Sequence, residues 1–264
     1  MRPNPWPLPR PEHPPDPKGH PSSVNPLKDF LVALTFLTRL GRAHITTNEA
    51  ISRSMPMYPM VGLLIGLILA LCTLLPLSSW VLAWMLTGLN IYLTRGLHWD
   101  GWADLWDGWG SGATGERFWA IVKDSHIGAF GTMGLILGLG LQTALFESAV
   151  SRDAWTALIF APVFGRFCCL VLARMGQNLS RPGLGQNAVQ GATRSALILG
   201  GCTTLLPALA LPGNHLVATL ALSIAALAAL QTLGRKQGGV NGDFLGAAII
   251  AGEVCALLPL ALPT

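Results

Sequence analysis

The sequence predicts an all-α fold, a polytopic integral membrane helix bundle with about seven spans that follow an N-terminal interfacial or re-entrant helix. Of the 264 residues, 51% are hydrophobic and only 11% are charged, whereas a soluble domain carries roughly 25% charged residues. No Asp, Glu, Lys or Arg lies between Arg53 and Arg95 or between Arg194 and Arg235. Each stretch is about twice the ~20 apolar residues that cross a bilayer. Breaks at 76–79 and 212–215 divide each into a hairpin of two spans.

The N-terminal part precedes these spans. Residues 1–26 are rich in Pro and charge, which predicts a disordered tail ahead of a membrane-embedded domain over 27–264. Leu27 to Leu40 is apolar on one helical face but too short to cross a bilayer, so we expect an interfacial or re-entrant helix. Residues 41–55 are expected to form a polar loop.

Seven spans are expected at 57–75, 80–97, 127–148, 154–173, 195–211, 215–233 and 244–262. The loops at 41–55, 95–126, 174–194 and 234–243 carry almost all the Lys and Arg, and the opposite loops carry only Arg152. This asymmetry places the charged loops in the cytoplasm. We therefore expect a multi-pass protein of a bacterial inner membrane with its chemistry at the cytoplasmic face.

Charge and cysteine content narrow the partners. The formal charge of +4 is accounted for by cytoplasmic anchoring in the lipid bilayer, and no basic helix indicates a nucleic-acid partner. The five cysteines lack metal-ligand spacing and are expected to be small buried hydrophobes. Whether the chain forms a homo-oligomer is left open.

The most informative stretch is 95–110, in which three carboxylates lie at i, i+4 and i+7: Asp100, Asp104 and Asp107. On a helix they project from one face. They repel one another unless a cation neutralises them, and Mg²⁺ is the usual partner of clustered carboxylate oxygens. A solvated helix face is the alternative, but such a face would interleave Lys or Arg. Gly101 and Gly108 weaken a helix, which makes sense where a phosphate-bearing substrate approaches the backbone.

Two further stretches and one charge are candidates. Asp124, before a predicted span, could complete a metal site, and Lys123 could pair with a phosphate; a helix cap by Asp124 or Ser125 is the alternative. Asp243, in the Gly-rich stretch before the last span, could bind a ligand, although capping is favoured when that stretch is taken alone. Arg166 lies inside a predicted span without an obvious partner, and an intramembrane charge is a functional candidate.

Two of these stretches carry a family resemblance. HWDGWADLWDGWGSG at 98–112 and KDSHIGAFG at 123–131 resemble motifs of the cobalamin synthase (adenosylcobinamide-GDP ribazoletransferase) family. FLTRL at 36–40, YPMVGLLIG at 58–66, GR at 165–166 and GGVNGDFLGA at 238–247 are similar to supporting features of that family. The resemblance runs from about residue 27 to the end.

The resemblance implies a Mg²⁺-dependent phosphoryl transfer. Adenosylcobinamide-GDP and α-ribazole, or its 5′-phosphate, would give adenosylcobalamin, or its 5′-phosphate, and GMP. The expected catalytic residues are Asp104, Asp107, His98 and Lys123. The expected Mg²⁺ ligands are Asp100, Asp104, Asp107 and Asp124, and the expected substrate-binding residues are Gly101, Gly108, Arg166 and Asp243. A wide cavity should bring these residues together, with Arg166 at its wall.

Two other function classes are weighed against this one. A CDP-alcohol phosphotransferase would carry D-G-x-x-A-R, whereas Asp100-Gly101 is followed here by Trp102-Ala103-Asp104 without the Arg. A transporter would place its charges near mid-membrane or show paired broken helices, whereas these carboxylates are expected at one membrane face. Release of GMP would separate the transferase from both.

Overall fold

The chain is described by a computed structural model over residues 25–41 and 47–262. The predicted tail at 1–26 lies almost wholly outside these residues. Within them the fold is all-α, and the one β-type contact is an isolated bridge between Ser180 and Val240. The predicted fold class is therefore confirmed.

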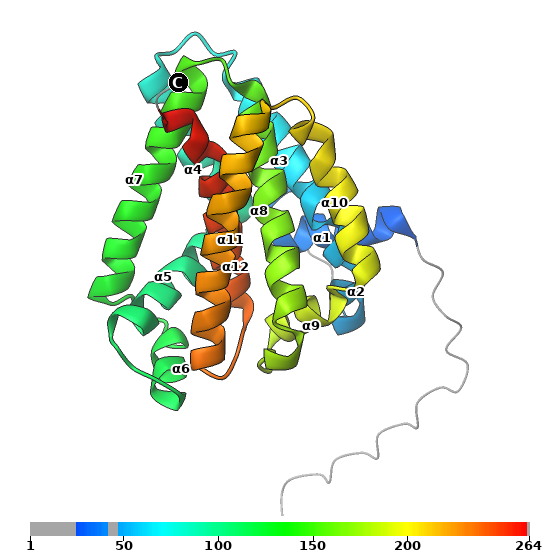
Figure 1. The fold of residues 1–264 in the computed structure, drawn as a ribbon, viewed down its shortest axis with the longest axis vertical. Helices are drawn as coiled ribbons and strands as arrows, with labels where there is room; N and C mark the ends of the chain where they lie inside the picture. Colours follow the sequence, from blue (N-terminus) through cyan, green and yellow to red (C-terminus); the bar gives the residue numbers. More distant parts are fainter. Residues whose placement is uncertain (1–24, 42–46, 263–264) are drawn as a thin grey trace, which may run out of the picture.

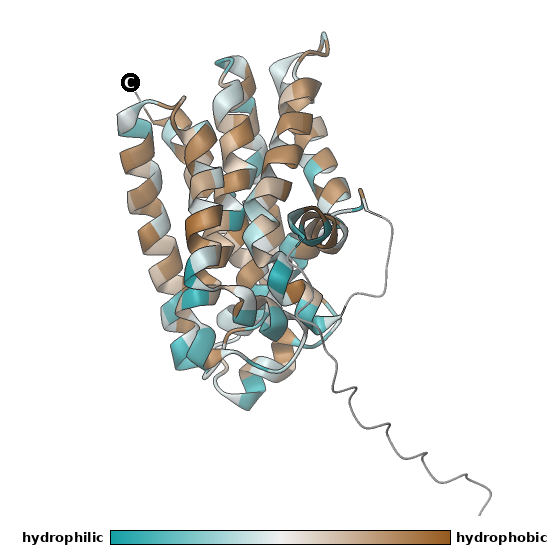
Figure 2. Cartoon of the chain, turned by 90° about the vertical axis from the view of Figure 1, so that its right-hand side faces the viewer, coloured by the Kyte–Doolittle hydropathy of each residue, from teal (hydrophilic) through white to brown (hydrophobic). Residues whose placement is uncertain are grey.

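The α-helices are α1 (Pro26–Leu37), α2 (Asn48–Ser54), α3 (Tyr58–Cys72), α4 (Ser79–Thr94), α5 (Leu97–Gly110), α6 (Glu116–Val122), α7 (Ala129–Ser151), α8 (Trp155–Met175), α9 (Leu184–Gly191), α10 (Arg194–Ala208), α11 (Gly213–Lys236) and α12 (Gly242–Leu257). The long helices run side by side in one bundle, with α6 and α9 toward its lower end in Figure 1. Figure 2 shows hydrophobic residues along these helices and hydrophilic ones gathered toward one end.

Five segments are long and apolar enough to cross a membrane: Asn48–Cys72, Ala129–Ser151, Trp155–Met175, Gly213–Lys236 and Gly242–Ala261. Helices also occupy the other two predicted spans, but α4 has 16 residues and α10 has 15. Both are shorter than the ~20 residues that cross a bilayer without help. Large apolar side chains such as Leu199, Leu220 and Ile224 are exposed, as expected of a surface that faces lipid.

The segment before the first span differs from the expected polar loop at 41–55. Residues 42–46 of that expected loop lie outside the described residues. After Thr47 the chain forms α2, which continues through a short 3-10 turn, Met55–Met57, into α3. Thr47 caps α2 by accepting a hydrogen bond from the Ala50 N–H. The charged residues that indicated a loop lie on the surface of α2, where Arg53 pairs with Glu49 at 3.1 Å.

Helix α8 lies at the centre of the bundle, packed against α3 on one side and α12 on the other. Glycines make both contacts close. Gly62 and Gly66 of α3 lie directly against the backbone of α8, and Gly165 of α8 lies against Gly252 of α12. Packing between backbones drives helix association where lipid removes the hydrophobic term. This tight core holds the N-terminal end of α12 beside α5, where the acidic residues lie.

Candidate active site

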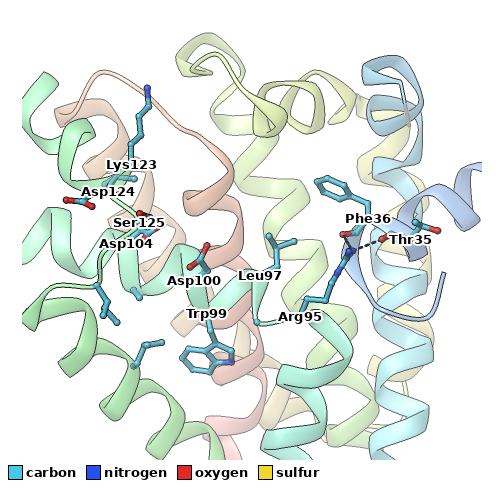
Figure 3. A pocket seen from close by; sticks show the side chains of 15 residues that line it. Thr35, Phe36, Arg95, Leu97, Trp99, Asp100, Asp104, Lys123, Asp124 and Ser125 are labelled. Carbon is cyan, nitrogen blue, oxygen red and sulfur yellow. Dashed lines mark hydrogen bonds between the residues drawn. The ribbon is translucent and has the colours of Figure 1, made fainter. Parts of the chain in front are cut away.

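A wide cavity, here called the outer cavity, opens beside α5. Its volume is about 1040 Å³. Its polar lining includes Thr35, Arg95, Asp100, Asp104, Lys123, Asp124 and Ser125. Figure 3 shows Asp100 and Asp104 beside the segment that carries Lys123, Asp124 and Ser125. The expected cavity is thus present, and four of the predicted site residues line it.

The start of α5 is set by an abrupt turn. Arg95 and Gly96 both have left-handed backbones, with φ of 59° and 68°, so α4 ends and α5 begins in a new direction. The Arg95 guanidinium donates hydrogen bonds to the carbonyl oxygens of Thr35 and Phe36, at 2.6 and 3.0 Å (Figure 3). Arg95 therefore ties α1 to the rim of the outer cavity, a role that the sequence analysis did not assign to it.

Asp104 has the most perturbed acidity at this site. Its partial burial, followed by the charges of Asp243, Asp100 and Asp107, raises the pKa of Asp104 to about 7. Burial and neighbouring like charges both disfavour an ionised carboxyl. A carboxyl poised near neutral pH can accept a proton in a reaction or lose its own to a cation.

Asp107 faces another element. One carboxylate oxygen accepts the Gly128 N–H and the other accepts the Gly131 N–H, each at 2.7 Å. These groups lie at the N-terminus of α7, where backbone donors lack partners within the helix. A Cβ at either glycine would fall within 2.4 Å of the Asp107 carboxylate. The G-x-x-G of the second motif (123–131) therefore holds an Asp of the first motif (98–112). Asp107 was expected to be catalytic and to bind Mg²⁺, but both of its oxygens accept backbone N–H groups and it does not line the outer cavity.

Asp124 and Lys123 lie at the rim of the outer cavity. Asp124 accepts a hydrogen bond from the His126 backbone at 3.0 Å and lies 2.7 Å from its imidazole. The backbone bond, followed by the imidazole, lowers the pKa of the Asp124 carboxyl. Lys123 ends α6 and is exposed. Both are accessible to a ligand in the outer cavity.

The Gly-rich stretch at 238–247, here called the third motif, packs against α5 beside the acidic residues. A Cβ on Gly101 would lie 2.7 Å from the Asp243 Cα, so α5 touches the first turn of α12 at this glycine. Asn241 caps α12 by accepting the Phe244 N–H, and it donates to the Asp243 carboxylate at 2.6 Å. The predicted meeting of the three motifs is confirmed, and the capping that was the alternative belongs to Asn241.

The two glycines predicted to admit substrate have another function. The α12 backbone occupies the space beside Gly101 where a side chain would lie. A Cβ on Gly108 would lie 2.6 Å from the Phe118 ring of α6. Neither glycine lines the outer cavity. Both allow close helix packing around α5, which corrects the expectation that they bind substrate.

His98 does not line the outer cavity, contrary to expectation. It is buried, and its Nε2 has no hydrogen-bond partner among the residues described. Burial, followed by the nearby Arg166 charge, lowers the pKa of His98 well below its usual range, so the imidazole is neutral. His98 lines a second, smaller pocket, which Tyr58 and Asp243 also line.

Arg166 is a buried ion-pair partner and not part of the cavity wall. It is 0% exposed, and it donates to Glu253 at 2.9 Å and to the Pro162 carbonyl oxygen at 2.9 Å. The other Glu253 oxygen accepts from Asn90 and Gln142 at 3.0 and 2.9 Å. This network joins four helices, and it supplies the partner for Arg166 that the sequence analysis did not find.

The acidic residues do not form a ready-made metal cage. Within the described ranges no three His, Cys, Asp or Glu side chains are placed to hold one ion. Asp100 and Asp104 both line the outer cavity, and burial, followed by the charges of Asp243, Asp100 and Asp107, raises the pKa of Asp104. Mg²⁺ typically takes one or two carboxylates and completes its shell with water and substrate phosphates. These two residues fit that pattern.

Fold and site together define a class of protein, a polytopic membrane helix bundle with a wide acidic cavity at one end, suited to phosphate chemistry. A model of the family described as cobalamin-5-phosphate synthase matches residues 29–261. The chain belongs to this family.

Named relatives agree with this assignment. An adenosylcobinamide-GDP ribazoletransferase of Nitratidesulfovibrio vulgaris (strain Miyazaki F) is 45% identical over 87% of this chain and 93% of its own. Enzymes of the same name from Brevibacillus brevis and Citrobacter koseri are 34% and 36% identical, each over 88% of this chain, and over 96% and 99% of their own. No solved structure matches the chain.

Proposed function

We propose that the protein is an adenosylcobinamide-GDP ribazoletransferase, which joins adenosylcobinamide-GDP to α-ribazole or its 5′-phosphate. The observation that carries the proposal is the meeting of three motifs beside one cavity: Asp100 and Asp104 line the cavity, Asp107 joins the second motif to the first, and Asp243 of the third motif lies against Gly101. The cavity, at about 1040 Å³, lies at the upper end of the usual range for ligand pockets, as a large corrinoid requires.

The reaction assigns steps to these residues. A ribose hydroxyl of the acceptor attacks the phosphorus on the cobinamide side of the pyrophosphate. The bond from that phosphorus to the bridging oxygen breaks, and GMP leaves with that oxygen. Asp104, which lines the outer cavity, accepts the hydroxyl proton, and Lys123 at the rim pairs with a phosphate. Asp107 holds the first motif against the second through its hydrogen bonds with the Gly128 and Gly131 N–H groups.

Mg²⁺ fits Asp100 and Asp104 with substrate phosphate oxygens as further ligands. When bound, the ion would neutralise charge on the pyrophosphate and on the leaving phosphate. Purified protein in detergent, given adenosylcobinamide-GDP and α-ribazole 5′-phosphate with Mg²⁺, should release GMP. Absence of GMP would contradict the proposal and favour a transporter or a different phosphotransferase.

Mg²⁺ should raise the Tm of the substrate-free protein more at about pH 8 than at about pH 5.5. The pKa of Asp104, about 7 in the fold, exceeds its ordinary value of 3.8. Proton binding therefore stabilises the fold at low pH, and this contribution is lost as the pH rises toward 7. Mg²⁺ competes with that proton. Thermal unfolding at both pH values checks this, and an equal Mg²⁺ effect at both, or in Asp104→Asn, would contradict it.

We infer that the outer cavity faces the cytoplasm of a bacterial inner membrane, because the loops around it carry most of the Lys and Arg. Ser111 and Ser78 are both exposed, at the end of α5 and the start of α4. A membrane-impermeant thiol reagent should label Ser111→Cys only from the cytoplasmic side and Ser78→Cys only from the other side. Wild type provides the background from Cys202. The reverse pattern would overturn the orientation.

A further inference from the structure

A second space, here called the inner pocket, adjoins the outer cavity. The two share Phe36 and Leu97 as lining residues. The inner pocket has a volume of about 160 Å³ and is reached by side chains of α1, α3, α5, α8, α9 and α12. Six helices that are far apart in the sequence therefore enclose one small space beside the acidic site.

Two buried polar atoms at the inner pocket have no hydrogen-bond partner within the described part of the chain. Tyr58 and His98 are 2% and 3% exposed, and both line the pocket. The Tyr58 hydroxyl and His98 Nε2 make no hydrogen bond to any residue of the described ranges. Leaving a buried polar group unsatisfied costs free energy, so such groups call for a specific explanation. A ligand with a polar atom between them would supply it.

Size and chemistry limit that ligand. Apart from Asp243, the remaining wall is largely apolar, with Leu37, Ala188, Leu245 and Ile249 among its residues. An apolar cavity of ~150 Å³ can hold a benzene molecule. The inner pocket thus has room for a small planar ring system, whereas a corrin ring or a guanosine diphosphate needs the outer cavity.

We infer that the inner pocket binds the planar heteroaromatic base of the acceptor nucleoside. The ring nitrogen of that base that carries no sugar accepts a hydrogen bond from the Tyr58 hydroxyl, and His98 Nε2 lines the same pocket. The ribose then lies toward Phe36 and Leu97, which border both spaces, so that a ribose hydroxyl enters the outer cavity near Asp104. This assignment rests on the proposed function and explains how the acceptor is held apart from the bulky phosphate donor.

Tyr58→Phe tests the assignment by removing one hydroxyl and keeping the ring. We expect the KM for α-ribazole 5′-phosphate to rise about five- to tenfold, the effect of losing one hydrogen bond worth ~1–1.5 kcal/mol. The KM for adenosylcobinamide-GDP should stay unchanged, with GMP release as the readout. Tyr92, the only other tyrosine, is exposed and outside both spaces, so Tyr92→Phe is the matched control and should leave both KM values unchanged.

Ala188→Val provides a second and independent test, because Ala188 is buried on α9 and lines the inner pocket. The added methyl groups should favour acceptors with an unsubstituted benzimidazole base over those with a dimethylated one, by about tenfold in relative kcat/KM. Both acceptors are measured with the same preparation of each variant, so the ratio of their kcat/KM values does not depend on the amount of folded protein. It therefore tests the pocket assignment even if Tyr58→Phe folds poorly.

The failures are distinguishable. No GMP from wild type would refute the proposed function and the pocket assignment with it. GMP from wild type, together with an unchanged acceptor KM in Tyr58→Phe and unchanged base selectivity in Ala188→Val, would refute the pocket assignment alone. A parallel rise in the KM of both substrates in Tyr58→Phe would also refute it, because it would indicate a general structural effect.

Discussion

Asp104→Asn is expected to lower the rate of GMP release about 10²- to 10⁴-fold, the usual contribution of a positioned acid or base. The amide keeps the shape of the side chain but cannot accept the hydroxyl proton or bind a cation as a carboxylate does. Removing one of several mutually repelling carboxylates should leave the Tm of the metal-free protein the same or higher, since burial and the neighbouring charges raise the pKa of Asp104 to about 7. The combined measurement of kcat and Tm separates a chemical role from a structural one.

Asp153→Asn is the matched control for that variant. Asp153 lies in the turn between α7 and α8 with a left-handed φ of 50°, a conformation that Asn adopts readily. The same chemical change there should leave GMP release unaltered. Wild-type activity in Asp104→Asn would remove this carboxyl from the chemistry, and a marked fall in its Tm would assign it a structural role.

Glu253→Gln is expected to produce the largest loss of stability. It would leave the Arg166 guanidinium, 0% exposed and 2.9 Å from the carboxylate, without a compensating charge. Breaking a buried pair by removing one partner costs about 3–5 kcal/mol, which corresponds to a fall in Tm on the order of 10 °C for a chain of this size. Thermal unfolding in detergent measures it.

The double variant Arg166→Met with Glu253→Gln should recover part of that loss, because no unpaired charge remains. Glu116→Gln is the matched control, since Glu116 is exposed and pairs with Arg181 at 3.2 Å on the surface. Exposed pairs contribute little to stability, so its Tm should hardly change. Equal Tm values for Glu253→Gln and Glu116→Gln would show that the buried network does not hold the bundle together.

The membrane fold and the acidic face could be predicted from the sequence because both are one-dimensional patterns. The stretch between Arg53 and Arg95 contains no charged residue, and such a long apolar stretch predicts membrane-spanning helices. Helical spacing likewise places Asp100 and Asp104 on one face, and both line the outer cavity. The charges of the loops predicted that the three motifs gather at one end of the bundle. The close contact between Gly101 and Asp243 agrees with this prediction.

The partners of individual side chains could not be predicted in this way. Asp107 has the spacing of a metal ligand, yet it lies about two turns beyond Asp100 along α5, where both of its oxygens accept N–H groups at the start of α7. The rotation and depth of packed helices depend on which glycines let backbones touch, as Gly101 and Gly108 do. These contacts form between segments that are distant in the chain, so no local spacing encodes them.

By itself the sequence determined that this chain is a charge-poor helix bundle with carboxylates collected at one end, because hydrophobicity and helical periodicity act along the chain. Only the tertiary structure decided that Glu253 neutralises Arg166 and that His98 and Tyr58 meet at the inner pocket. The physical reason is that a buried polar group must find its partner across helix interfaces. Which partner it finds is set by how six helices pack together and not by its neighbours in sequence.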